Sequence, residues 1–144
     1  MWTGGFRQTQ QMTVRPPPKR CGPTVMGVIA MIFEFSLDLD DPAAGQEYAD
    51  ESARMRELAP EVDGFLGIER FADEQQPGRY VAIGYFRDEV AVTAWRNTSA
   101  HRRAQTLGRR RLFTDYRLVM AEVIRDYGPH DRGQAPSDSR RAHG

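Results

Sequence analysis

The chain has 144 residues, which is enough for one domain, and its 20 basic and 20 acidic side chains give a formal net charge of +0. That balance is uneven, because residues 27–128 hold 13 of the basic and 18 of the acidic residues, a net charge of −5. An acidic body argues against binding to nucleic acid, whose phosphates are neutralised by Lys and Arg. Cys21 is the only cysteine, so an internal disulfide and a cysteine-based metal site are excluded.

The sequence also carries no sign of a membrane or an export route. No run approaches 18 apolar residues, so we predict no membrane-spanning helix. The first residues lack the apolar core of a secretory signal. A single cysteine fits a reducing compartment. We therefore expect a cytoplasmic protein.

The two ends differ in composition from the rest. Residues 1–26 are polar and include a run of three prolines, Pro16 to Pro18, so they lack the apolar surface that would offset chain entropy. Residues 129–144, which are rich in Pro, Gly, Ser and Arg, have the same character. We predict a disordered N-terminal extension over 1–26, one domain over 27–128 and a disordered tail over 129–144.

The domain opens with a strand and a helix. Residues 28–37 are apolar at both alternating sets of positions, which predicts a strand that is covered on both faces. Asp40, Asp41 and Pro42 then supply a turn and a helix start. Apolar residues follow at spacings of three and four up to Val62, as on one face of a helix. Asp63 and Gly64 end that helix.

Two strands, a second helical region and a last strand follow. Residues 65–72 and 80–86 form a hairpin around the turn-rich loop 73–78. Asp88 is a good helix N-cap, and Trp95 lies on the apolar face of the helix that follows. A second helical piece reaches Gly108, which breaks it, and residues 116–124 form the last strand. The order β-α-β-β-α-β predicts an α+β, ferredoxin-like fold with a four-stranded antiparallel sheet.

This arrangement has a consequence for assembly. Two helical regions cover only one face of a four-stranded sheet, while the strands carry apolar residues toward both faces. An exposed apolar sheet of that size is a liability for a monomer. The sequence therefore favours a homodimer in which two sheets pack face to face.

The stretch from Tyr85 to Tyr127, the strand around Phe33 to Phe35 and the segment from Asp63 to Phe71 resemble the antibiotic biosynthesis monooxygenase family. This family lies within the dimeric αβ-barrel superfamily, and the resemblance spans about residues 27–128. It implies a barrel made by two sheets, and a ligand pocket between the helices and the sheet of each subunit. The helix that carries Trp95 would form one wall.

Some members of this group degrade heme, and the resemblance can be tested at their functional positions. Those members use an Asn on the first strand, a Trp on the second helix, and a His ten residues after the Trp as the iron ligand. Trp95 matches the Trp, but Gln105 stands at the ligand position and residues 32–36 contain no Asn. Gln is a poor axial ligand for heme iron. We therefore disfavour heme degradation and expect no cofactor and no metal.

The candidate catalytic residues are His101, Trp95 and Asn97. His101 is the only histidine within 27–128 and suits a general base, since its unperturbed pKa lies near 6.5. The alternative is a surface histidine beside Arg102 and Arg103. Trp95 and Asn97 can donate hydrogen bonds to a substrate oxygen, or serve as a core aromatic and a cap between the two helical pieces. The expected substrate pocket consists of Tyr85, Phe86, Phe33 and Phe113, with one of Tyr85 and Phe86 facing it.

The run Arg109, Arg110 and Arg111 has two interpretations. It is either a positive mouth for acidic substrates or a solvated helix end in which the cations meet the C-terminal dipole. For the whole chain, the resemblance implies a cofactor-independent monooxygenase, an oxidoreductase that uses dioxygen on a small aromatic or polyketide-like substrate. The alternatives are a dimeric small-molecule-binding or stress-related protein without catalysis and, less favoured, a heme-degrading monooxygenase.

Overall fold

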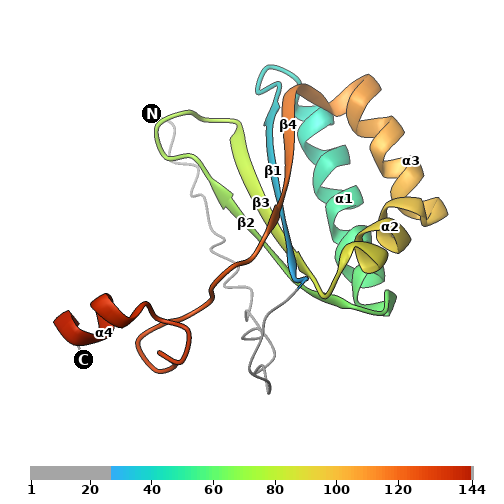
Figure 1. The fold of residues 1–144 in the computed structure, drawn as a ribbon. Helices are drawn as coiled ribbons and strands as arrows, with labels where there is room; N and C mark the ends of the chain where they lie inside the picture. Colours follow the sequence, from blue (N-terminus) through green and yellow to red (C-terminus); the bar gives the residue numbers. More distant parts are fainter. Residues whose placement is uncertain (1–26, 144) are drawn as a thin grey trace.

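The computed structural model describes residues 27–143. The predicted disorder of residues 1–26 lies outside this range. The described elements, in chain order, are β1 (Ile29–Leu37), α1 (Pro42–Leu58), the 3-10 turn η1 (Ala59–Glu61), β2 (Phe65–Ala72), β3 (Arg79–Phe86), α2 (Glu89–Asn97), α3 (Ser99–Leu107), the π-helical turn η2 (Gly108–Leu112), β4 (Phe113–Glu122) and α4 (Ser137–His143) (Figure 1).

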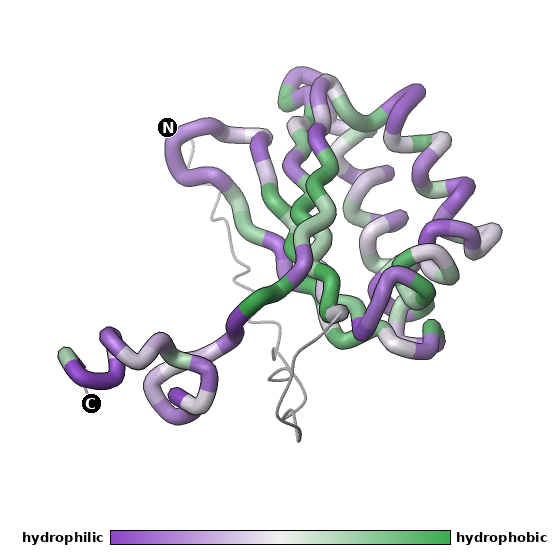
Figure 2. Tube along the Cα trace, viewed as in Figure 1, coloured by the Kyte–Doolittle hydropathy of each residue, from purple (hydrophilic) through white to green (hydrophobic). Residues whose placement is uncertain are grey.

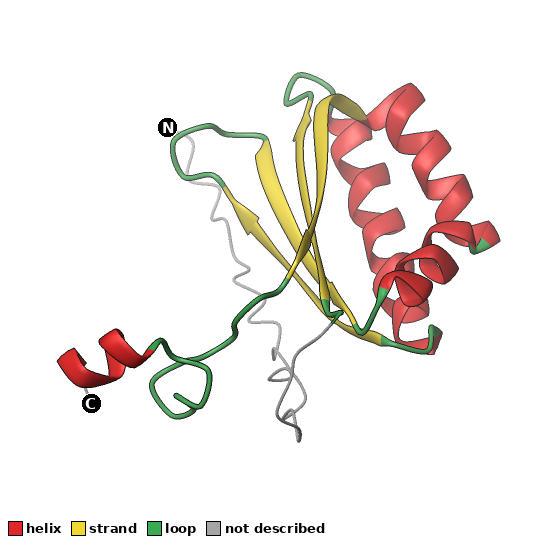
Figure 3. Ribbon diagram, in the orientation of Figure 1, coloured by secondary structure: helices red, strands yellow, loops and turns green. Residues whose placement is uncertain are grey.

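The four strands form one antiparallel sheet in the order β2-β3-β1-β4. This order and the β-α-β-β-α-β connectivity confirm the predicted α+β, ferredoxin-like fold. Helices α1, α2 and α3 all lie on one side of the sheet, and the other side carries no helix (Figure 3). The last strand begins and ends earlier than the predicted 116–124, because η2 leads directly into Phe113.

Aspartates start the two helices that cover the sheet. The Asp41 carboxylate accepts hydrogen bonds from the N–H groups of Ala43 and Ala44, both at 3.1 Å, and Pro42 takes the first helical position, where no N–H is needed. The Asp88 carboxylate accepts from the N–H of Ala91 at 2.8 Å, so the predicted N-cap is confirmed.

The entry of α2 is held by an ion-pair network around Arg87. Its guanidinium donates to both carboxylate oxygens of Asp63, at 3.1 and 2.9 Å, and to Asp88 at 3.1 Å. These contacts lower the pKa of Asp63, while the pKa of Asp88 is lowered first by the Ala91 N–H and then by Arg87. Gly64 sits beside this network at φ 87°, and a side chain there would collide with Ala91. Asp63 and Arg87 thus join β2 to the end of β3.

The second helical region differs from its prediction at both of its breaks. The break between α2 and α3 lies at Thr98, whose extended backbone (ψ 141°) interrupts the helix and whose hydroxyl caps α3 by accepting the His101 N–H at 3.2 Å. Gly108 was predicted to end the region, but it has helical φ and ψ of −55° and −51° and continues into η2. Its lack of a side chain serves close packing, because a Cβ at 108 would enter the ring of Phe113.

Two packed groups form the core between the sheet and the helices. In one, the fully buried Phe35 contacts the rings of Tyr48, Tyr80 and Phe113, with centroids 5.0 to 5.5 Å apart. In the other, the fully buried Phe86 packs with Trp95 and three small residues, Ala59, Ala91 and Val92. Figure 2 shows that hydrophobic residues concentrate along the strands, whereas α3 and the C-terminal segment are mostly hydrophilic.

The face of the sheet opposite the helices, here called the open face, is also apolar. Cross-strand partners in an antiparallel sheet point to the same side. Since Phe35 and Phe86 point toward the helices, their neighbours along each strand point away. The open face therefore carries Ala30, Ile32, Phe71, Val81, Ile83, Tyr85, Val119 and Ala121. Each of these side chains is partly or largely exposed.

Beyond Val123, whose N–H still donates to the Val28 carbonyl, the chain leaves the sheet, and α4 stands apart from the body (Figure 1). The predicted tail without regular structure is described here as a turn closed by the Gly128 N–H and the Asp131 carbonyl, followed by α4. Among residues 27–143, no helix has the length and apolar character needed to span a bilayer.

Candidate functional site

The rings of Trp95 and His101 form the centre of the candidate site. They stack in parallel, with centroids 4.4 Å apart and planes inclined by 18°. The break at Thr98 makes this possible, because it turns α3 back so that a residue six positions after Trp95 lies over the indole. Trp95 is 7% exposed, while His101 is partly buried. The sequence predicted both residues for the site, and the structure brings them together.

His101 is held through its Nδ1 atom. This nitrogen lies 3.2 Å from the Trp95 carbonyl oxygen and 3.3 Å from the Gln105 Nε2 atom. Since Nδ1 is engaged within the chain, Nε2 is the ring nitrogen left for a ligand. Burial lowers the pKa of His101; the contact with the Trp95 carbonyl opposes this, and the charge of Arg102 adds to the lowering. The imidazole is therefore neutral at pH 7, as a general base requires.

Gln105 fixes the surroundings of His101. Its Oε1 accepts from the Arg102 guanidinium at 3.1 Å, and its Nε2 donates to the Arg96 carbonyl at 3.2 Å. The amide thus ties α3 to the end of α2. All of its polar atoms are engaged, so the residue at the position of the heme ligand has a structural role in this chain.

Asn97 and Tyr85 lie apart from the Trp95–His101 pair. The Asn97 side chain is exposed at the end of α2 and accepts from Arg102 at 2.5 Å. It does not cap α3, because Thr98 does. Tyr85 is on the open face, because its neighbour Phe86 points toward the helices and successive strand residues alternate. Of this adjacent pair, Phe86 is the one that packs against Trp95.

Phe33 and Phe113, the other two predicted pocket residues, meet on the helix side with ring centroids 5.4 Å apart. Beside them, the cover provided by the helices ends. Tyr116, Leu118 and Met120 pair with Phe35, Phe33 and Met31, so they point toward the helix side. Yet they are 44%, 55% and 39% exposed. We call these three residues the β4 shelf.

The β4 shelf is continuous with the Trp95–His101 pair. Met31 lies directly across from Met120, and Met31 also packs against the group that contains Phe86 and Trp95. An apolar path therefore runs from Tyr116 along β4 to Met120 and across β1 to the indole. Sequence reasoning missed the shelf. Its signal is the apolar alternation at 116, 118 and 120, which repeats the period of two expected for one face of a strand.

The three consecutive arginines of η2 have three different surroundings. Arg111 donates to Asp41 at 2.6 Å and lies 3.7 Å from Glu47, and its hydrogen bond lowers the pKa of Asp41. The Arg110 side chain lines a shallow outer groove of about 480 Å³ with side chains of α3, among them Arg102, Arg103, Thr106 and Leu107. Arg109 lies 5.9 Å above the ring of Tyr116 on the β4 shelf.

A smaller hollow of about 240 Å³ lies between α1 and α3, and Met55, Leu58, Ala100 and Leu107 are among its lining residues. Within residues 27–143, no three His, Cys, Asp or Glu side chains are grouped as they would be around a metal ion.

Comparison with known proteins places this fold and site in a family. The model of the antibiotic biosynthesis monooxygenase family matches residues 31–107, more than half of the chain. The chain belongs to the antibiotic biosynthesis monooxygenase family. The match covers the strands β1 to β3 and the helices through α3, and it ends before the β4 shelf.

Two relatives are similar to this family member in sequence. It is 29% identical over 96 residues to a protein of Pyricularia oryzae described as jasmonate monooxygenase ABM, a match that covers 67% of this chain and 43% of that protein. It is 31% identical over 78 residues to the uncharacterized protein YqjZ of Bacillus subtilis, covering 54% of this chain and 67% of that protein. The chain thus spans less than half the length of the Pyricularia relative.

Solved structures agree on the fold. SnoaB of Streptomyces nogalater, described as a cofactor-independent oxygenase, superposes with a TM-score of 0.59 at 17% identity, covering 72% of this chain and 98% of SnoaB. PA3566 of Pseudomonas aeruginosa superposes with the same TM-score at 14% identity, covering 72% of this chain and all of that chain. At these identities the likeness concerns the fold alone.

Proposed function

We propose that this protein is a cofactor-independent monooxygenase that acts on a small aromatic or polyketide-like substrate with dioxygen. The observation that carries the proposal is the stack of His101 on Trp95 at the end of an exposed apolar shelf. It unites a neutral imidazole, an indole and an apolar surface in one place. Family membership and the likeness in fold to a cofactor-independent oxygenase support the same reaction class.

In the proposed reaction His101 is the base. The Nδ1–H tautomer, which donates to the Trp95 carbonyl, leaves the Nε2 lone pair free to remove a proton from an electron-rich ring carbon or hydroxyl group. The resulting anion gives an electron to dioxygen, and the two radicals combine into a peroxide. Loss of water then leaves a carbonyl group on the substrate. A CH₂ group and O₂ become C=O and H₂O, so the four electrons come from the substrate and no other reductant is needed.

Apolar surroundings assist the first step. A dry site strengthens the interaction of the substrate anion with nearby N–H donors. The Trp95 indole N–H is such a donor, whereas Asn97, which lies at the surface and is bonded to Arg102, acts through the position of α3.

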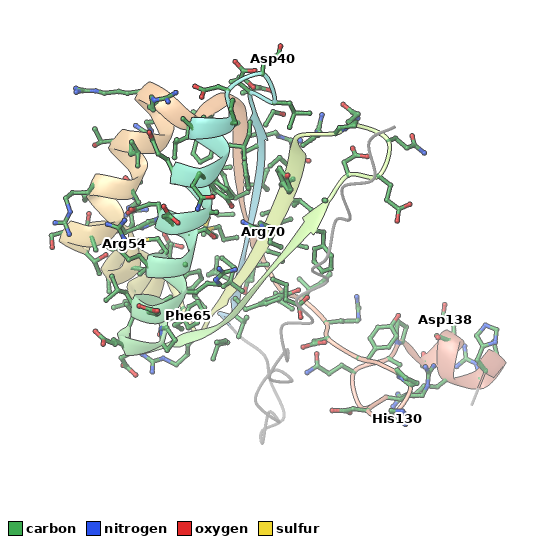
Figure 4. The ribbon with its side chains drawn as sticks, turned by 180° about the vertical axis from the view of Figure 1, so that it is seen from behind. Asp40, Arg54, Phe65, Arg70, His130 and Asp138 are labelled. Atoms are coloured by element: carbon green, nitrogen blue, oxygen red, sulfur yellow. The ribbon has the colours of Figure 1, made fainter. Side chains whose placement is uncertain are left out.

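Dioxygen uptake tests this function. We would measure it with a panel of phenols and anthrones for the wild-type protein, His101→Ala, Trp95→Phe and the control His130→Ala. His130 lies in the segment after β4, away from the helices (Figure 4). We expect uptake by the wild type and the control, and a loss of about 10²-fold or more in His101→Ala, as for other general bases. Background uptake with every substrate, or full activity in His101→Ala, would refute the proposal.

A homodimer through the open face belongs to the same proposal. Its eight apolar side chains are partly or largely exposed in a single chain, and pairing of two such faces would bury them in a barrel. Sedimentation should show a dimer at micromolar concentration, and Ile83→Glu on the open face should shift it to monomer. A cytoplasmic location and the division into one domain with two tails remain predictions of the sequence.

One observation favours the non-catalytic alternative, a small-molecule-binding protein. The contacts of His101 with Trp95 and Gln105 would also suit a histidine that only stabilises the junction of α2 and α3. The two functions differ in one result. If ligands bind equally well to the wild type and His101→Ala while no substrate consumes dioxygen, the chain is a binder.

A further inference from the structure

Arg109 differs from its neighbours in having no charged partner. Arg111 is paired with Asp41 and Glu47, and Arg110 points into the outer groove. Among the described residues no carboxylate lies within 4.0 Å of the Arg109 guanidinium. Its recorded neighbour is instead the ring of Tyr116, the first residue of the β4 shelf. A positive charge thus marks one end of an exposed apolar surface.

The other end of the shelf has the opposite charge. Glu122 pairs with Ile29 on the helix side, two residues beyond Met120. Strand residues advance by about 3.4 Å, so Tyr116 and Met120 are about 14 Å apart. A ligand that lies along the shelf therefore meets a cation first, then about 14 Å of apolar surface, and then a carboxylate that repels a second anion.

We propose that the β4 shelf binds an elongated aromatic or polyunsaturated carboxylate, with its carboxylate on Arg109 and its apolar body along Leu118 and Met120. The inference rests on the proposed function, whose substrate class it narrows. The planar guanidinium offers two parallel N–H donors to a carboxylate and lies over an aromatic ring that orients it. A neutral ligand would shield the guanidinium from water without supplying an acceptor of equal strength.

This orientation also connects the shelf to the reacting groups. With the carboxylate held at the Tyr116 end, the far end of the ligand reaches Met120 and Met31, next to the group that contains Trp95. The carbon to be oxidised then lies at the end of the molecule remote from the acid. Arg109 is accordingly a residue for specificity, while His101 and Trp95 carry the chemistry.

Binding of a matched pair of fluorescent probes tests the inference. Anthracene-2-carboxylate and anthracene-2-carboxamide have the same shape and differ in charge. We would titrate both into the wild-type dimer or monomer as purified, and into Arg109→Gln, Arg110→Gln and Leu118→Gln. Circular dichroism would establish that each variant is folded, which we expect because all three side chains are exposed.

We expect the wild type to bind the carboxylate about tenfold more tightly than the amide, a difference in keeping with one charge-assisted hydrogen-bonded pair. Arg109→Gln should remove this difference without weakening amide binding. Arg110→Gln, its neighbour in the chain, should preserve the difference, and Leu118→Gln should weaken both probes.

Three results would overturn the inference. Equal affinity for the two probes in the wild type would show that charge is not read. An equal effect of Arg109→Gln and Arg110→Gln would show a diffuse attraction to the arginine run. Unchanged binding in Leu118→Gln would place the probes elsewhere, as expected if a second copy or its C-terminal segment covers the shelf.

The binding test and the dioxygen test fail separately. Charge-dependent binding through Arg109 without dioxygen uptake would support the shelf and refute catalysis. Uptake of dioxygen with neutral substrates alone would support catalysis and refute the shelf as a carboxylate site.

Discussion

The helix side of the sheet has two halves that differ in how completely they are covered. Under α1 and α2 the strands β1 and β3 carry Phe35 and Phe86, which are 2% and 1% exposed. Along β4 the helix-side residues Tyr116, Leu118 and Met120 remain 39% to 55% exposed, although they have the same alternation and comparable size. The contrast shows that burial here follows the reach of the helices. Function is best sought at the boundary, where a packed core meets an exposed apolar strand.

Truncation of one large side chain in each half gives the largest expected difference. Phe86→Ala should lower the free energy of unfolding by about 3–5 kcal/mol, because it removes a ring from a fully packed group and leaves a cavity. Leu118→Ala should change it by roughly 0.5 kcal/mol or less, as for other exposed positions. Urea denaturation followed by circular dichroism measures both. Similar losses in the two variants would mean that β4 is covered in solution.

A glycine at the boundary gives the next effect. Gly108 has helical dihedral angles, so alanine should favour its conformation by up to about 1 kcal/mol. Its Cβ would nevertheless enter the ring of Phe113, which packs on Phe33, Phe35 and Tyr48. Since overpacking typically costs about 1–3 kcal/mol, we expect Gly108→Ala to destabilise the fold.

The matched control for this change is Gly45→Ala. Gly45 lies inside α1, and a Cβ there would meet no other atom within 4 Å. The helix preference then acts alone, and stability should rise by about 0.5–1 kcal/mol. If thermal unfolding showed both variants to be stabilised, the contact between Gly108 and Phe113 would be looser than the structure indicates.

Much of the fold could be predicted from local patterns. Asp88 before the second helix and the hairpin loop 73–78 are short-range signals whose outcome depends on neighbours in the chain. The break at Thr98 could not be placed in this way, because the sequence offers Asn97 as an equally good cap. Gly108 was misread for a related reason. A glycine that ends a helix and one that admits an aromatic ring look alike until the ring of Phe113 is located.

The candidate site shows the same limit. His101 and Trp95 were found because few residue types can serve as base and aromatic donor. Tyr85 and Phe86 could be assigned to opposite faces but not to a particular one, since alternation fixes only their difference. The β4 shelf depends on where the helices stop, which is a property of the packed molecule. The same holds for the three arginines, whose separate partners come from α1, α3 and β4.

The smallest effect concerns the pH dependence of His101, which lies at the boundary itself. Burial makes its pKa in the folded protein lower than the value of about 6.5 in the unfolded chain. The unfolded state therefore binds a proton first as the pH falls. The contribution of His101 to stability is present in full above pH 6.5 and is lost as the pH drops through the folded-state pKa.

An NMR titration of the imidazole should accordingly give a midpoint below 6.5, and the acidic limb of dioxygen uptake should follow that midpoint. His101→Gln should flatten the fall of unfolding free energy between pH 7.5 and pH 5. Arg102→Gln should raise the midpoint, because it removes a nearby positive charge. A midpoint at or above 6.5 in the wild type would mean that the ring is open to water, and the packed half of the sheet would then end before Trp95.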